Sequence, residues 1–199
     1  MLKEICSIAT GNAANSLSTM SERRVDISLP NVMVESLDKV ADIFGKREKD
    51  VSAVSFSVSG EISGSMALVF SYSQSVKIAN ILTKRNTSQD KNLDEMGQSA
   101  LMELGNIVAG SYVRVLADGL KMRITYSIPG FDHDMIGVIL DEIVVRLPTE
   151  VESAIVMESE FIIKEETFLG QLIFILEPSS LNSVVKALGS RDEQGQSRE

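Results

Sequence analysis

The feature that most constrains the fold of this chain is an internal repeat. Residues 4–30 and residues 103–129 follow the same pattern, displaced by 99 positions. The first copy begins with the letters EICSIATG and the second with ELGNIVAG, and each then runs through an alternating segment to a proline, Pro30 or Pro129. Self-similarity of this kind indicates that one structural unit is used twice. We therefore expect an internally duplicated domain with pseudo-two-fold symmetry.

The segments before the two prolines have the alternation of half-buried strands. The apolar positions are Val25, Ile27 and Leu29 in the first copy, and Ile124, Tyr126 and Ile128 in the second. Proline has no N–H for a strand ladder, so each strand is expected to end there. Neither copy alternates strands and helices as a parallel sheet requires. The pattern predicts an α+β fold with a mainly antiparallel sheet and two long helices that carry the sites.

The polar stretches of the sequence set the expected domain boundaries. Residues 83–94 are polar and too few for a true interdomain linker, which favours a connector between repeats. The last residues, 189–199, lack apolar side chains and are expected to form a polar tail. We predict one domain over residues 1–188, built from repeats at about 1–90 and 91–188.

Composition excludes several classes of protein. With 199 residues, of which 44% are hydrophobic, the chain can bury a core. Its formal net charge of −9 argues against nucleic-acid binding, which depends on clustered Lys and Arg. No apolar run is long enough for membrane insertion, and the N-terminus does not resemble a signal peptide. A single cysteine cannot form an internal disulfide, so we expect a cytoplasmic protein.

Few side chains suit metal or nucleophilic chemistry, because the chain has one Cys and one His. Cys6 lies in an apolar helical pattern and is interpreted as a small buried hydrophobe. His133 lies between Asp132 and Asp134 and is interpreted as a solvated loop histidine. A metal-dependent hydrolase built on these three residues is disfavoured, since alternate side chains of a strand point to opposite faces. We predict no metal-binding and no cofactor-binding residues.

The segment from about residue 93 to residue 116 has two helical stripes. The apolar stripe, expected to face the core, holds Leu101, Leu104, Val108 and Val115; the second stripe holds Ser99, Glu103, Asn106 and Gly110. The second stripe can be read simply as the solvated side of an amphipathic helix. However, Asn is a poor helix former, and Gly105 and Gly110 each cost about 1 kcal/mol relative to Ala. A helix with these residues is expected to have a function, with Gly110 letting another backbone approach.

These residues resemble the CheC, CheX and FliY family of chemotaxis phosphatases, and the resemblance covers nearly the whole chain. The family pattern is an Asp or Ser, three residues, a Glu, two residues, an Asn, twenty-two residues and a Pro. Every position and every gap is matched by Ser99, Glu103, Asn106 and Pro129.

The first copy departs from the family pattern. Glu4 and Pro30 are present at the right spacing, but Ser7 stands where the family has Asn. We therefore interpret Glu4 and Ser7 as a weak second site. Ser99, Pro129 and Pro30 are interpreted as structural residues that shape the helix start and the strand ends.

The resemblance implies a substrate and a role for each site residue. The substrate is the aspartyl phosphate of a phosphorylated response regulator similar to CheY. Asn106 would orient the attacking water, and Glu103 would bind a lysine of the regulator. Mg²⁺ would be held by the regulator and not by this chain.

A second interpretation is a module that binds without catalysis, since a fold does not fix a function. Its partner would be a response regulator, a receptor deamidase similar to CheD, or a component of the flagellar switch. The Ser at position 7 favours this interpretation for the first repeat, whereas Ser99, Glu103 and Asn106 favour catalysis for the second.

Overall fold

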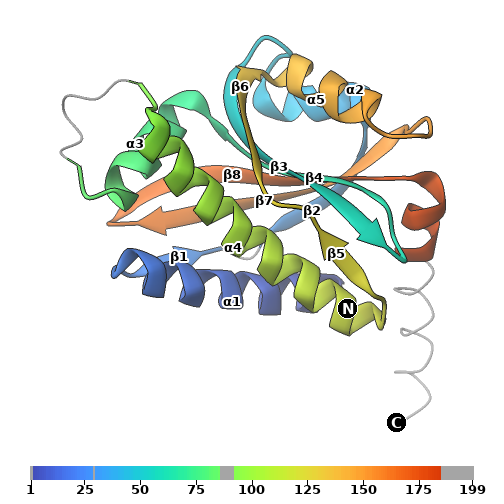
Figure 1. Ribbon diagram of the computed structural model, residues 1–199, viewed down its shortest axis with the longest axis horizontal. Helices are drawn as coiled ribbons and strands as arrows, with labels where there is room; N and C mark the ends of the chain where they lie inside the picture. The colour runs from blue at the N-terminus through green and yellow to red at the C-terminus, as the bar shows by residue number, and fades with distance from the viewer. Residues whose placement is uncertain (1, 29, 86–91, 185–199) are drawn as a thin grey trace.

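Both predicted repeats contribute strands to one antiparallel sheet. The computed structural model describes residues 2–28, 30–85 and 92–184, and this part of the chain contains an eight-stranded sheet flanked by helices (Figure 1). The predicted α+β class with an antiparallel sheet is confirmed. The connector at residues 86–91 and the tail at 189–199 lie outside the described residues.

The two halves have the same order of elements. The first half contains α1 (Leu2–Ser21), β1 (Val25–Ile27), β2 (Asn31–Ser36), α2 (Leu37–Val40), the 3₁₀ helix η1 (Ala41–Phe44), β3 (Asp50–Gly60), β4 (Gly64–Ser71) and α3 (Tyr72–Leu82). The second contains α4 (Glu95–Leu120), β5 (Ile124–Tyr126), β6 (Gly130–Met135), α5 (Ile136–Val145), β7 (Ser153–Ile163) and β8 (Glu166–Leu176), followed by helical residues 178–184. The duplication itself stays a prediction from the sequence.

The strand pairing exchanges elements between the halves. The main strand order is β1-β7-β8-β4-β3-β5, with β2 also on β7 and β6 also on β3. The first half therefore places β1 and β2 on β7, a strand of the second half, and the second half places β5 and β6 on β3, a strand of the first. Neither half completes its pairing alone.

Each proline lies in the short connection between two edge strands, directly before the second strand and not directly after the first. β1 ends at Ile27 and β5 at Tyr126, and the next strands begin one residue after Pro30 and Pro129. The expectation that Ile128 is half-buried is wrong, because its side chain is 88% exposed. Leu29 lies outside the described residues.

The sheet separates two apolar clusters. One contains residues of α1, α3 and α4 and alternate strand residues such as Val54 and Phe56. The other contains α2, η1 and α5 with the intervening strand residues, among them Val51 and Ala53. Figure 1 shows α2 and α5 together, apart from α1 and α4. The predicted site helix thus lies on one covered face of the sheet.

Helices α1 and α4 pack against each other in antiparallel directions. The hydroxyl groups of Thr10 and Tyr112 form a buried hydrogen bond of 3.0 Å, whereas Ile5, nearer the start of α1, meets Gly119 near the end of α4. Within the described ranges, no helix combines the length and apolar character needed to cross a bilayer.

Candidate functional site

The site helix α4 begins at a capped end. The Asp94 carboxylate accepts a 2.9 Å hydrogen bond from the Gly97 N–H and lies 2.7 Å from Nη1 of Arg85. The Gly97 N–H and then Arg85 hold the pKa of Asp94 below its ordinary value. Ser99 does not shape the helix start as expected, because Asp94 is the N-cap and Ser99 lies inside α4, donating a 2.8 Å hydrogen bond to the Glu95 carbonyl. A side chain one turn earlier performs the capping.

The apolar stripe of α4 faces the core, as predicted. Its members are all buried: Leu101, Leu104, Val108 and Val115. The glycines of the helix have packing roles. A Cβ on Gly105 would lie 2.6 Å from Cγ1 of Val54, and a Cβ on Gly110 would lie 2.6 Å from the hydroxyl of Tyr126. The expectation that Gly110 lets another backbone approach is therefore wrong, since the side chain of Tyr126 occupies that space.

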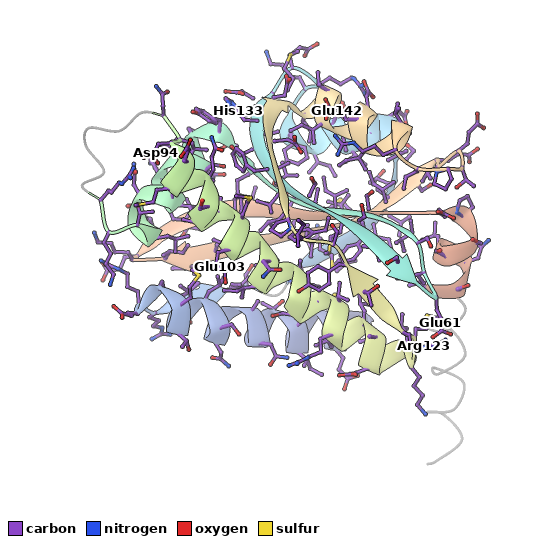
Figure 2. The ribbon with its side chains drawn as sticks, viewed as in Figure 1. Glu61, Asp94, Glu103, Arg123, His133 and Glu142 are labelled. Atoms are coloured by element: carbon purple, nitrogen blue, oxygen red, sulfur yellow. The ribbon has the colours of Figure 1, made fainter. Side chains whose placement is uncertain are left out.

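Glu103 and Asn106 lie on the other side of α4. Glu103 is exposed and Asn106 is partly exposed, one helical turn further along. Figure 2 labels Glu103 on the side of α4 that is nearer to α1 in this view. Within the described residues, neither side chain has a hydrogen-bond or ion-pair partner. An acid and an amide are thus both available to a molecule outside the chain.

A groove of about 640 Å³ lies along the contact between α1 and α4, beside Asn106, and β5 forms part of its wall. We call it the interhelical groove, and its lining consists of Asn12, Asn15, Ser16, Asn106, Ile107, Gly110, Ser111, Val113, Arg114, Ile124 and Tyr126. Asn12, Asn15 and Arg114 were not predicted from the sequence as site residues. The same signal that singled out Asn106, an Asn inside a helix, was present at both positions of α1.

The structure does not gather all the motif residues in one place. Pro129 lines a different pocket, of about 510 Å³, which is rich in serines and also contains Arg146. Glu4 and Ser7 lie exposed on α1, and neither is part of the interhelical groove. Pro30 is buried between β1 and β2. Of the stripe of Ser99, Glu103, Asn106 and Gly110, the interhelical groove is lined by Asn106 and Gly110 among the residues described.

The Asp132–His133–Asp134 segment has separate structural contacts. His133 lies in β6, so the predicted loop is wrong, whereas its side chain is exposed as predicted. Its ring stacks on Tyr72 at 3.8 Å, and its Nε2 lies 2.8 Å from Asp50. The hydroxyl of Ser55 donates to Asp132, and the backbone N–H of Met135 donates to Asp134. Across the described part of the chain, no group of three or more His, Cys, Asp or Glu side chains is placed to hold a metal ion.

Cys6 is buried, as predicted. Its side chain is 1% exposed, and its thiol lies 3.7 Å from the sulfur of Met157. Burial raises the pKa of the Cys6 thiol to about 11, so the thiol stays protonated at neutral pH. A protonated, enclosed thiol does not act as a nucleophile.

The antiparallel sheet agrees with the fold predicted from the sequence, and the exposed Glu103 and Asn106 lie on the helix that carries the family motif. A model of the CheC-like family matches residues 96–131, which include Glu103 and Asn106. The chain is 28% identical over 194 residues to the CheY-P phosphatase CheC of Bacillus subtilis, covering 96% of this chain and 93% of that protein. The resemblance to the CheC, CheX and FliY proteins is confirmed.

Two further matches agree with this resemblance. The flagellar motor switch phosphatase FliY of B. subtilis is 30% identical over 127 residues, which are 63% of this chain and 33% of FliY. The crystal structure of Thermotoga maritima FliY has the same fold, with a TM-score of 0.75 and 23% identity over 96% of this chain and 94% of that one.

Proposed function

We propose that this chain is a cytoplasmic phosphatase that hydrolyses the aspartyl phosphate of a CheY-like response regulator. The observation that carries the proposal is the exposed side of α4, where Asn106 has no partner among the described residues and lines the interhelical groove. Two relatives named as phosphatases, one of them similar over nearly the whole chain, support the same chemistry.

The proposed reaction needs little covalent help from the enzyme. An aspartyl phosphate is a mixed anhydride, so water attacks phosphorus, the phosphorus–oxygen bond to the aspartyl group breaks, and the carboxylate and inorganic phosphate leave. The side-chain oxygen of Asn106 accepts a hydrogen bond from the water. This contact orients the lone pair of the water oxygen toward phosphorus. Positioning and electrostatics are what phosphoryl transfer chiefly requires of a protein.

Glu103 supplies the orientation of the complex. It lies one turn before Asn106 and is exposed, so its carboxylate can bind a cationic side chain of the regulator while Asn106 enters the regulator's active site. We assign Mg²⁺ to the regulator, whose acidic residues would hold it together with the phosphoryl group. Glu4 and Ser7 form the weaker second site, since a serine hydroxyl reaches less far than an amide.

A second candidate function is an adaptor that binds the regulator without hydrolysing its phosphate. The specific observation behind it is Ser7, which replaces the amide on α1 and leaves one repeat without a water-positioning group. A deamidase similar to CheD or a flagellar switch component would be a partner of such an adaptor.

The test is the rate at which a phosphorylated CheY-like regulator loses its phosphoryl group with and without this protein. We expect the wild-type chain to speed the decay, and Asn106→Ala to reduce this acceleration roughly 100-fold, as removal of one positioned hydrogen-bonding group does in other enzymes. Because the Asn106 side chain has no hydrogen-bond partner among the residues described, the variant should keep its unfolding midpoint.

The matched control is Ser7→Ala, the corresponding position of α1, which should lose far less activity. Greater damage from Ser7→Ala than from Asn106→Ala would show that the wrong repeat was assigned. Binding of the regulator without any faster decay would establish the adaptor instead of the enzyme.

A further inference from the structure

Among the residues that the structure describes, Arg114 lacks an ion-pair partner, whereas most of the other arginines have one. Five of the seven arginines in the described residues lie within 4.0 Å of a carboxylate: Arg24, Arg47, Arg85, Arg123 and Arg146. Arg114 is exposed on α4 and is the one charged side chain among the residues that line the interhelical groove. The chain has a formal net charge of −9, so carboxylates are plentiful. A guanidinium that pairs with none of those described, beside the proposed site, is available to bind an anionic group of a partner.

The groove around Arg114 also holds amides that the fold does not use. The side chains of Asn12, Asn15 and Asn106 have no hydrogen-bond partner among the residues described. Each Asn amide can donate and accept at once, which suits the peptide groups of an extended segment. Ile107, Ile124 and Tyr126 supply apolar surface in the same groove.

Arg114 lies some distance along α4 from Asn106, where the phosphoryl group would react. It follows Asn106 by eight residues, which is about 12 Å along a helix axis. A phosphoryl group in contact with Asn106 is therefore out of reach of its guanidinium. Arg114 is suited to a second contact with the same partner, at a distance from the reacting atoms.

We propose that the interhelical groove receives an acidic loop of the phosphorylated regulator. Arg114 binds a carboxylate of that loop in a paired hydrogen-bond geometry, and Asn12 and Asn15 bind its backbone. The identity of the partner rests on the proposed function, but the groove and its unpaired groups do not. Arg114 is thus a residue that determines which regulator is bound, whereas Asn106 acts on the water.

The experiment measures catalysis and binding separately for Arg114→Ala, Arg114→Lys and a control, Arg123→Ala. Arg123 is 94% exposed, and Figure 2 labels it beside Glu61, well away from Glu103. Catalysis is the KM and kcat for dephosphorylation of the regulator. Binding is the Kd for the same regulator loaded with beryllium trifluoride, an unreactive mimic of its phosphoryl group.

We expect Arg114→Ala to raise both KM and Kd about 10-fold or more, the loss typical of one charge-assisted contact, with kcat within about twofold of wild type. Arg114→Lys should recover part of this affinity, because lysine keeps the positive charge but lacks the planar pair of N–H donors of the guanidinium. Arg123→Ala should change neither constant more than about twofold.

An unchanged KM and Kd in Arg114→Ala, with Asn106→Ala still inactive, would overturn this inference and leave the proposed function standing. If the wild type binds the regulator loaded with beryllium trifluoride but does not speed the dephosphorylation of the phosphorylated regulator, the proposed function fails, and the Kd series alone decides the role of the groove. A fall in kcat without a change in Kd would also contradict the assignment, since it would place Arg114 in the chemical step.

Discussion

At the scale of single residues, the surroundings of a glycine decide what it does. Gly11 on α1 and Gly105 on α4 are both inside long helices, where glycine is unfavourable. Nothing lies within 4 Å of the place where a Cβ would stand on Gly11, whereas at Gly105 the side chain of Val54 lies 2.6 Å away. The same residue type is thus dispensable for packing in one helix and required in the other.

These surroundings predict opposite effects of the same substitution. Gly11→Ala should raise the free energy of unfolding by about 0.5–1 kcal/mol, because alanine restricts the unfolded chain and meets no obstacle. Gly105→Ala should lower it by about 1–3 kcal/mol, the usual effect of overpacking a helix against a strand. Urea unfolding of both variants checks this, and changes of the same sign would contradict the packing described for α4.

At the scale of elements, α4 depends on the residue just before it. Asp94 caps the helix through Gly97 and pairs with Arg85, and both contacts favour the charged carboxylate. Because the pKa of Asp94 is lowered in the folded protein, its contribution to stability is complete above its ordinary value of 3.8. That contribution is lost as the pH falls through the lower folded value.

We therefore predict that Asp94→Ala lowers the urea midpoint at pH 7, where α4 loses both its cap and its ion pair. The difference from wild type should narrow as the pH is taken below about 3.8, since the wild-type carboxylate then also becomes neutral. The control is Asp94→Asn, which keeps a capping oxygen and should retain part of the stability without this pH dependence. A difference that stays constant down to pH 2 would exclude the charge as the cause.

At the scale of the whole molecule, the halves complete each other. β1 and β2 pair with β7, β5 and β6 pair with β3, and the buried Thr10–Tyr112 hydrogen bond joins α1 to α4. A repeat on its own would leave the apolar face of α1 and the edge of β3 in water. The repeat seen in the sequence is therefore not an independent folding unit in this arrangement.

The corresponding prediction concerns the two repeats made as separate chains, residues 1–90 and 91–199. Each alone should lack a cooperative urea transition, because its edge strands have no partner strand. An equimolar mixture should regain such a transition and, with it, phosphatase activity. A cooperative transition in either fragment by itself would contradict the exchange of strands between the halves.

Several conclusions required only the sequence. The period of apolar residues placed the long site helix and its buried stripe, because local periodicity reports directly on which side of a helix is covered. The absence of strand–helix alternation predicted the α+β class and the antiparallel sheet. The spacing of Glu103 and Asn106 also sufficed to put them one turn apart on the same exposed side.

Only the tertiary structure decided what surrounds those residues. The contact of Tyr126 with Gly110 and the stacking of His133 on Tyr72 depend on how separate elements meet in space. The interhelical groove likewise combines residues about 100 positions apart. Periodicity within one segment carries no information on the distance or angle between two packed helices, so Asn12, Asn15 and Arg114 joined the site only once α1 was placed beside α4.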